Sequence, residues 1–228
     1  MRLPKSVSRR EFDQLVKAAR FSLKNPGRSK RPLPKDERSG YSHIYLFRHT
    51  QTFDNVRRIF SGRRNSRLTV EGIKQAKGLA EKLRHKKIDL IFASPLVRCQ
   101  QTAQLVLKYH PKARLVMDPL ILERDYGRLS GKNKEKLMRE NFEKAVLYRR
   151  AYDFPPPGGE SLKQVEKRVK SFYKKILKLA ENEPGISIGI SATNNTMRLL
   201  RMFFENLNKR KMQTIENPYG DYAAYSLK

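Results

Sequence analysis

Short apolar runs alternate with segments of helical apolar spacing along most of the chain. Short apolar runs predict strands at residues 43–48, 88–94, 114–117, 186–191 and 222–227. Segments with apolar residues three or four positions apart predict helices at residues 70–84, 97–109, 132–150, 161–180 and 195–205. This order is typical of an α/β fold, and we expect a three-layer, doubly wound, mostly parallel sheet with helices on both faces.

Residues 1–42 follow a different pattern. Ser8 to Glu11 resembles a helix-capping box, and apolar residues recur at helical spacing from Phe12 to Leu23. Pro26-Gly27 and the two prolines of residues 31–34 then interrupt a charged stretch. We therefore expect a basic N-terminal extension, made of one amphipathic helix and a linker, before a domain at residues 43–228.

Composition limits the class of protein. The chain has 228 residues with a net charge of +28, and 38% of them are hydrophobic, which is enough for a core. The charge favours anionic partners. A basic solvated surface would account for it equally well. The sequence has no helix-turn-helix, zinc-finger spacing or basic stretch with interleaved aromatics, so nucleic acid is not the expected partner.

The cellular location can also be predicted from the sequence. No apolar run approaches the roughly 18 residues that a membrane-spanning helix needs, so we expect no membrane association. The N-terminus lacks the apolar region of a secretory signal. Cys99 is the single cysteine, which rules out an intramolecular disulfide and a cysteine-clustered zinc site. These features predict a cytoplasmic protein.

Chemically active side chains follow the predicted strands. Arg48 and His49 end the first strand, Arg98 begins the helix after the second, and Glu123 follows the third. The carboxyl ends of parallel strands meet at one edge of a sheet, so we expect these side chains to converge. An imidazole beside a fixed cation stays neutral and nucleophilic, and a nearby carboxyl group could protonate a leaving oxygen.

The motifs around these residues are similar to those of a known family. Arg48-His49 with Thr52 and Asn55 resembles an Arg-His-Gly-x-Thr signature followed by Asn, except that Thr50 replaces the glycine. Further matching blocks are Leu68-Thr69 with Gly72 and Gln75-Ala76, and Ser94-Pro95-Leu96-x-Arg98 with Gln101-Thr102-Ala103. Over residues 43–228 the chain resembles the histidine phosphatase superfamily, which includes cofactor-dependent phosphoglycerate mutases and many phosphomonoesterases.

The middle of the chain resembles two branches of that family. The blocks Glu123-Arg124-x-Tyr126-Gly127, Gly131-x-Asn133-Lys134 and Arg149-Arg150 resemble the mutases, whereas Gly158-Gly159-Glu160-Ser161 resembles the phosphatases. Both an isomerase of the mutase type and a hydrolase therefore remain open. The resemblance implies substrate-binding residues at Asn55, Ser61, Gly62, Tyr126, Lys134, Arg149, Arg150, Asn194 and Asn195. A solvated basic helix face is the other interpretation of Lys134, Arg149 and Arg150.

The resemblance also implies a mechanism. His49 would attack a phosphate monoester and form a phosphohistidine, with Arg48 and Arg98 stabilising the transferring group and Glu123 protonating the leaving oxygen. The expected partner is a small phosphorylated metabolite. No metal or other cofactor would be required, apart from 2,3-bisphosphoglycerate as phosphoryl donor if the protein is a mutase. The sequence leaves open whether copies associate into a homo-oligomer.

One position departs from the family pattern. Thr193 occupies the place of the second catalytic histidine. A hydroxyl group cannot carry positive charge, and loss of one preorganised donor costs about 10²–10³ in rate, so we expect weakened activity. His43, His85 and His110 are predicted to lie at the opposite edge of the sheet. The alternatives are a phospholigand-binding protein without catalysis and a basic interaction protein.

Overall fold

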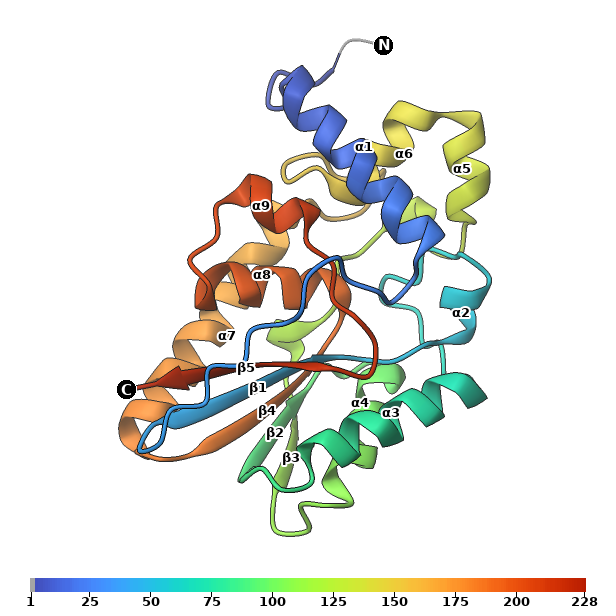
Figure 1. The fold of residues 1–228 in the computed structure, drawn as a ribbon. Coiled ribbons are helices and arrows are strands. Elements are labelled where there is room, and N and C mark those ends of the chain that lie inside the picture. The colour runs from blue at the N-terminus through green and yellow to red at the C-terminus, as the bar shows by residue number, and fades with distance from the viewer. Residues whose placement is uncertain (1–2) are drawn as a thin grey trace.

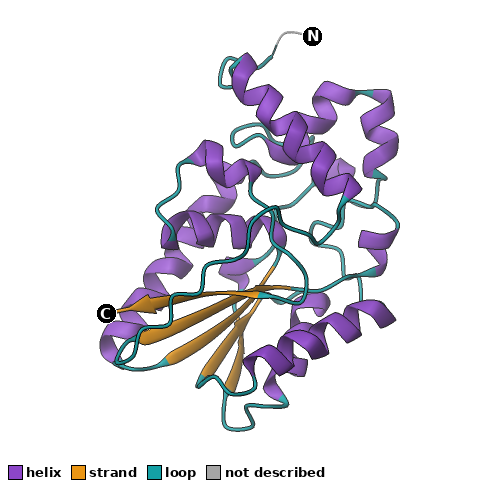
Figure 2. Ribbon diagram, in the orientation of Figure 1, coloured by secondary structure: helices purple, strands orange, loops and turns teal. Residues whose placement is uncertain are grey.

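A mixed five-stranded sheet forms the centre of the molecule (Figures 1 and 2). The structure, a computed structural model, describes residues 3–228. The strands are β1 (Ser42–Arg48), β2 (Leu90–Ala93), β3 (Arg114–Met117), β4 (Ser187–Ala192) and β5 (Tyr222–Leu227), in the order β3-β2-β4-β1-β5. The first four are parallel and β5 pairs antiparallel to β1. The predicted α/β fold with a mostly parallel sheet is confirmed.

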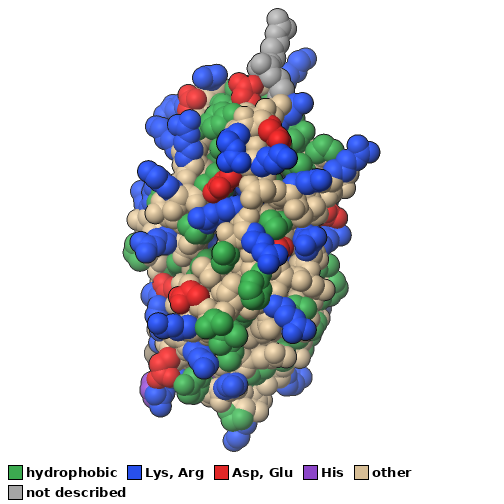
Figure 3. Space-filling view, turned by 90° about the vertical axis from the view of Figure 1, so that its right-hand side faces the viewer, with side chains coloured by type: hydrophobic (Ala, Val, Ile, Leu, Met, Phe, Trp, Pro, Cys, Tyr) green, Lys and Arg blue, Asp and Glu red, His purple; other side chains and the backbone are tan. Residues whose placement is uncertain are grey.

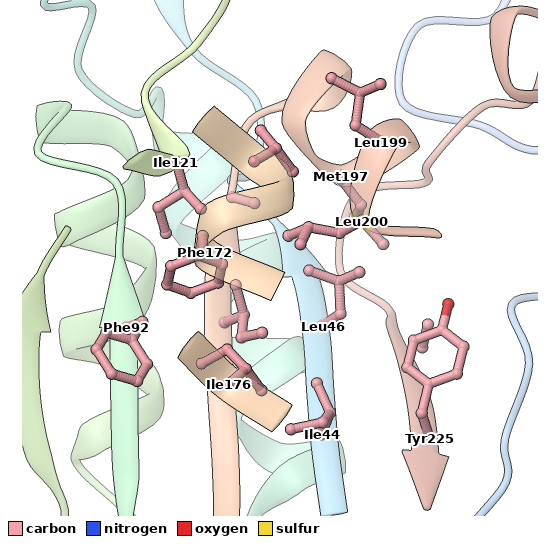
Figure 4. Close-up of a cluster of buried hydrophobic side chains, with 14 of the residues drawn as sticks. Ile44, Leu46, Phe92, Ile121, Phe172, Ile176, Met197, Leu199, Leu200 and Tyr225 are labelled. Carbon is pink, nitrogen blue, oxygen red and sulfur yellow. The ribbon is translucent and has the colours of Figure 1, made fainter. Parts of the chain in front are cut away.

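Helices cover both faces of this sheet. The helices α7 (Leu162–Asn182) and α8 (Asn194–Phe204) cover one face, and α3 (Val70–Leu83) and α4 (Val97–Leu107) cover the other. Side chains of β1 alternate between the two layers. Leu46 packs in the cluster with α7 (Figure 4), whereas Phe47 packs with α3 and α4. Because β1 is buried on both faces, its sequence is a nearly continuous apolar run.

The predicted helical region at residues 132–150 is divided in two. Helix α5 (Lys134–Glu140) ends at Asn141, and α6 (Phe142–Arg150) begins directly after it. The Asn141 side chain accepts a hydrogen bond from the Lys144 backbone N–H, which is the preferred role of asparagine at a helix start. The helices α2 (Phe53–Val56) and α9 (Lys209–Thr214) were not predicted, because they are too short to show a period. Two 3₁₀ turns, η1 (Pro119–Ile121) and η2 (Gly127–Leu129), complete the elements.

The N-terminal helix α1 (Arg9–Lys24) forms as the pattern predicts and is docked on the rest of the chain. Ser8 Oγ caps it by accepting the Glu11 N–H at 3.2 Å. Its apolar face shares a buried cluster with residues of α6, and Figure 1 shows α1 beside α6, away from the sheet. Further on, residues 34–36 run along β5 through backbone hydrogen bonds to Ala224. The division of the chain at residue 42 stays a prediction.

Basic residues are spread over the surface. On the face in Figure 3, Lys and Arg side chains are scattered from one end of the molecule to the other, with fewer acidic groups among them. In the part of the chain that the structure describes, no helix combines the length and the apolar character that crossing a bilayer requires.

Candidate active site

A cavity of about 120 Å³ brings together most of the predicted site residues. The predicted residues that line it are Arg48, His49, Asn55, Ser61, Gly62, Arg98, Glu123, Tyr126, Lys134, Arg149, Arg150, Asn194 and Asn195. They come from the segments that follow β1, β2, β3 and β4, and from α5 and α6. Thr193 is not among the residues that line the cavity.

His49 is held in one tautomer. Its Nδ1 lies 2.8 Å from the carbonyl oxygen of Thr50, which can only accept, so Nδ1 carries the proton and Nε2 carries the lone pair. The ring is 4% exposed. Burial, followed by the charges of Arg98 and Arg48, lowers the pKa of His49 well below its ordinary value. The imidazole is therefore neutral near pH 7 and has a nitrogen available as a nucleophile.

Two buried guanidinium groups flank this histidine. Arg98 donates to the carbonyl oxygens of Gly62 at 2.7 Å and Arg64 at 2.8 Å, and Arg48 donates to the Asn217 carbonyl oxygen at 3.1 Å. The Nε atoms of both arginines are buried without a protein partner. An unpaired buried donor costs about 1–3 kcal/mol, so an anion that accepts from these groups would recover that energy. The pair is suited to the oxygens of a phosphoryl group.

Tyr219 belongs to the site but was not predicted. Its ring centroid lies 4.5 Å from the guanidinium carbon of Arg48, and its hydroxyl oxygen accepts from Arg48 Nη2 at 3.4 Å. The ring also lies against His49, at 6.5 Å between centroids. Tyr219 and the Asn217 carbonyl oxygen together hold the Arg48 guanidinium group. It belongs to the loop before β5, where no motif marks it.

The carboxyl group of Glu123 lies in the same cavity. It is 6% exposed, and its Oε1 accepts the backbone N–H of Arg124 at 2.7 Å. Asn55 is partly committed elsewhere, because its Oδ1 accepts the Thr52 N–H in the capping box of α2. Its amide nitrogen is the atom left for a ligand. Gly62 contributes through the carbonyl oxygen that holds Arg98.

A second cationic group lines the same cavity and comprises Lys134, Arg149, Arg150 and Arg198. Glu216 accepts hydrogen bonds from Arg150 and Arg198 and partly neutralises the group. Burial alone would raise the pKa of Glu216, but the charges of Arg150 and Arg198 outweigh it and lower the pKa to about 2. Arg198 and Glu216 were not predicted as site residues. Arg198 follows Thr193 by five residues, in the stretch that departs from the family pattern, and that position could have identified it.

Substituting Glu216 by glutamine is expected to lower the free energy of unfolding by about 3–5 kcal/mol, because two buried guanidinium groups lose their counter-charge. The folded-state pKa of Glu216 lies below its ordinary 4.5, so its contribution is complete above that pH and is lost as the pH falls towards 2. Urea unfolding at pH 7 and pH 3 measures both effects.

The matched control is Glu140→Gln, because Glu140 forms an exposed pair with Lys136. It should change the stability by less than about 1 kcal/mol. Equal effects of the two substitutions would contradict the structural role assigned to Glu216.

Lys134 makes anion binding depend on pH. Burial, followed by the charges of Arg149 and Arg48, lowers the pKa of Lys134 to about 7. Above that pH the ammonium group of the free protein loses its proton and attracts an anion less. Sulfate keeps its charge across this range, so its affinity should be about tenfold weaker at pH 8 than at pH 6. Titration calorimetry measures it. The Lys134→Met variant should lose this dependence, and equal affinities at both pH values in the unaltered protein would refute it.

Thr193 lies next to His49 but is not among the residues that line the cavity. Its neighbour Ala192 pairs with Arg48 in the sheet, and the Ala192 carbonyl oxygen accepts the His49 N–H at 3.0 Å. The Thr193 side chain is fully buried, and its hydroxyl group donates to Thr196 Oγ1 at 3.1 Å. Position 193 is therefore adjacent to His49, while the threonine itself makes an internal hydrogen bond.

The single cysteine and the other histidines lie outside the cavity lining. No group of three or more His, Cys, Asp or Glu side chains there could hold a metal ion. Cys99 is buried, and burial raises the pKa of its thiol to about 12, so it carries no thiolate at neutral pH. His43, His85 and His110 do not line the cavity.

Comparison with known proteins places this site in a family. A sequence model of the histidine phosphatase superfamily (branch 1) matches residues 44–227. The chain belongs to this superfamily. A 2,3-bisphosphoglycerate-dependent phosphoglycerate mutase of Sinorhizobium fredii is 36% identical over 194 residues, covering 81% of this chain and 90% of the relative. The same-named protein of a Methylobacterium species is 35% identical over 190 residues, covering 81% and 91%.

Solved structures agree on the fold. The α-ribazole phosphatase of Shigella flexneri superposes with a TM-score of 0.70 at 26% identity, over 82% of this chain and 94% of that one. A phosphoglycerate mutase of Bacillus anthracis shares the fold with a TM-score of 0.62 at 20% identity, over 83% and 93%. The family and its members support an enzyme of the phosphomutase or phosphatase type, acting by phosphoryl transfer or hydrolysis.

Proposed function

We propose that the protein transfers the phosphoryl group of a small phosphate monoester through a phosphohistidine at His49. The observation that carries this proposal is the neutral His49 ring, fixed through Nδ1 and flanked by two buried arginines with unpaired Nε donors. Nε2 attacks phosphorus and the ester oxygen leaves with a proton from Glu123. Water or a second hydroxyl group then attacks phosphorus and gives its proton to the Glu123 carboxylate, while the bond from phosphorus to Nε2 breaks and returns the lone pair to His49. Arg48 and Arg98 stabilise the charge on the equatorial oxygens in both steps.

The second cationic group supports a substrate that carries another anionic group. Lys134, Arg149 and Arg198 line the same small cavity as His49, so one compact molecule can contact both ends. A phosphoglycerate has this form, and the relatives at about 35% identity are named for it. On the mutase branch, the two cationic ends fit a donor with two phosphates, and we propose 2,3-bisphosphoglycerate for that role. On the phosphatase branch, water is the acceptor and no donor is needed.

The rival function is phospholigand binding without chemistry. The observation that favours it is the hydroxyl group of Thr193, which is engaged with Thr196 and, on this proposal, offers no second donor to a phosphoryl group. Binding would still use Arg48, Arg98, Arg149 and Arg150, whereas phosphoryl transfer would be too slow to matter. We rank it second, because the nucleophile, the anion-binding arginines and the carboxyl group are all retained.

A single-turnover experiment separates the two functions. The protein is mixed with radiolabelled 3-phosphoglycerate or 2,3-bisphosphoglycerate and quenched in alkali, which preserves phosphohistidine. The proposal predicts an acid-labile phosphoenzyme with the label on His49, located by peptide mass spectrometry. Ligand binding by calorimetry without any phosphoenzyme would establish the rival function. The ratio of phosphoglycerate isomer to free phosphate among the products then decides between the mutase and the phosphatase.

A further inference from the structure

The N-terminal segment forms one wall of the catalytic cavity. Ser22, Leu23, Pro26 and Gly27, from the end of α1 and the turn after it, line the cavity together with the predicted site residues. The family model begins at residue 44, so this wall lies outside the part of the chain that it matches. The rest of the cavity lining comes from residues 48–219.

The same segment fixes part of the second cationic group. Arg149 donates to the Ala19 carbonyl oxygen at 3.2 Å and to Ser22 Oγ at 2.8 Å. Arg150 donates to the Ala18 carbonyl oxygen at 2.9 Å. These hydrogen bonds hold both guanidinium groups against α1. An arginine side chain without such bonds could move to fit ligands of different sizes. The position of α1 therefore fixes where these two guanidinium groups lie.

The turn after α1 touches the other end of the site through Tyr219. Gly27 has a φ of +68°, and a Cβ atom there would lie only 1.9 Å from Tyr219 Cδ2. The Tyr219 N–H donates to the Gly27 carbonyl oxygen at 2.9 Å. Tyr219 in turn holds Arg48. The segment therefore contacts Tyr219, which holds Arg48, and it also holds two arginines of the second cationic group.

The wall is anchored by apolar packing. Phe12 and Leu15 of α1 are buried in one cluster with Val146 and Leu147 of α6. The anchor lies on the helix face that carries Phe12 and Leu15, whereas the cavity-lining residues 22–27 lie at its C-terminal end. Substitutions in the wall should therefore alter the cavity without removing the anchor.

We propose that residues 9–27 are the specificity-determining element of this site: they restrict it to compact phosphate monoesters with a second anionic group and exclude bulky esters. The cavity of about 120 Å³ is well below the roughly 300–1,000 Å³ of pockets for drug-sized ligands. The claim that the ligand is a phosphate monoester rests on the proposed function. The claim that this wall sets its size rests on the contacts of residues 18–27.

Equilibrium binding to the full-length protein tests the inference independently of catalysis. Calorimetry compares 3-phosphoglycerate with 1-naphthyl phosphate, which carries a bulky apolar group and no second anion. The unaltered protein should prefer 3-phosphoglycerate by about 100-fold. The double variant Leu23→Ala/Pro26→Ala should reduce this preference at least about tenfold. The control Lys24→Ala, at an exposed neighbouring position, should leave it unchanged.

A pair of glycine variants tests the link through Tyr219. Gly27→Ala and Gly40→Ala both place a Cβ at positive φ, but an added Cβ at Gly40 meets nothing within 4 Å. The backbone strain is therefore matched, and only Gly27→Ala displaces Tyr219. We expect Gly27→Ala to weaken the binding of inorganic phosphate at least about tenfold and Gly40→Ala to leave it unchanged. Equal binding by the two variants would overturn the inference.

The remaining outcomes are also decisive. An unchanged ligand preference in a folded double variant, or no preference or no binding in the unaltered protein, would overturn the inference. Failure of the proposed function looks different: no phosphoenzyme forms, although the ligand preference still follows the wall. If a phosphoenzyme forms on His49 while the preference ignores the wall, the inference alone is wrong.

Discussion

Replacing His49 by alanine should lower the rate of phosphoryl transfer on the order of 10⁴-fold or more, because loss of a nucleophile removes the covalent route. The two arginines would remain, so phosphate binding should persist. The hydrogen bonds that hold the two arginines do not involve His49. Arg98 is held by the carbonyl oxygens of Gly62 and Arg64, and Arg48 by Asn217 and Tyr219. Single-turnover kinetics with labelled 3-phosphoglycerate gives the rate, and calorimetry with inorganic phosphate gives the affinity.

The control for this experiment is His85→Ala. His85 is exposed and does not line the cavity, so its removal should change neither the rate nor the affinity. Measuring both variants also in a chain with Thr193→His widens the range of rates that can be followed. A folded His49→Ala protein that retains its rate within about tenfold would exclude His49 as the nucleophile.

The second large expected effect is an increase in the rate of phosphoryl transfer. Thr193→His is expected to raise the rate of phosphoryl transfer about 10²–10³-fold, because it restores a donor beside the transferring group. The position is suitable, because Ala192 pairs with Arg48 and accepts the His49 N–H, so the next residue lies adjacent to His49. The threonine hydroxyl group now bonds to Thr196 and would give way to an imidazole that can also carry charge. Single-turnover rates of the two proteins provide the comparison.

The matched control is Thr193→Gln, a donor of similar reach that stays neutral. A small gain with glutamine and a large one with histidine would assign the effect to charge. Equal gains would assign it to hydrogen bonding alone. If Thr193→His folds with an unchanged thermal midpoint and gains nothing, position 193 does not serve the transferring phosphoryl group.

Much of the fold and site could be predicted from local signals. All five strands are present where the apolar runs placed them, with β2 shortened to Leu90–Ala93. His49, Arg98 and Glu123 meet in one cavity because parallel strands deliver the residues after their carboxyl ends to one edge of the sheet. Short elements escaped prediction. Helix α2 has four residues, and Asn141 divides a region whose apolar spacing continues through it.

Other parts of the site depend on contacts that leave no local signal. The motif predicts that Arg149 binds substrate. In the structure, two of its hydrogen bonds go to residues of α1 that lie 127 and 130 positions away in the sequence. Glu216 is an ordinary acidic residue in the sequence, and only folding brings Arg150 and Arg198 to it. Such partners are selected by three-dimensional packing, which no window of the sequence contains.

The sequence by itself determined the alternation of strands and helices and the family motifs at the strand ends, and it singled out Thr193 as a departure from the family pattern, because each is a property of neighbouring residues. The tertiary structure decided which atoms are free to act. It directs the Thr193 hydroxyl group to Thr196, fixes the proton on His49 Nδ1, and brings the N-terminal segment into the cavity lining. The physical reason is that protonation, desolvation and cavity size arise from groups far apart in the chain that become neighbours only when it folds.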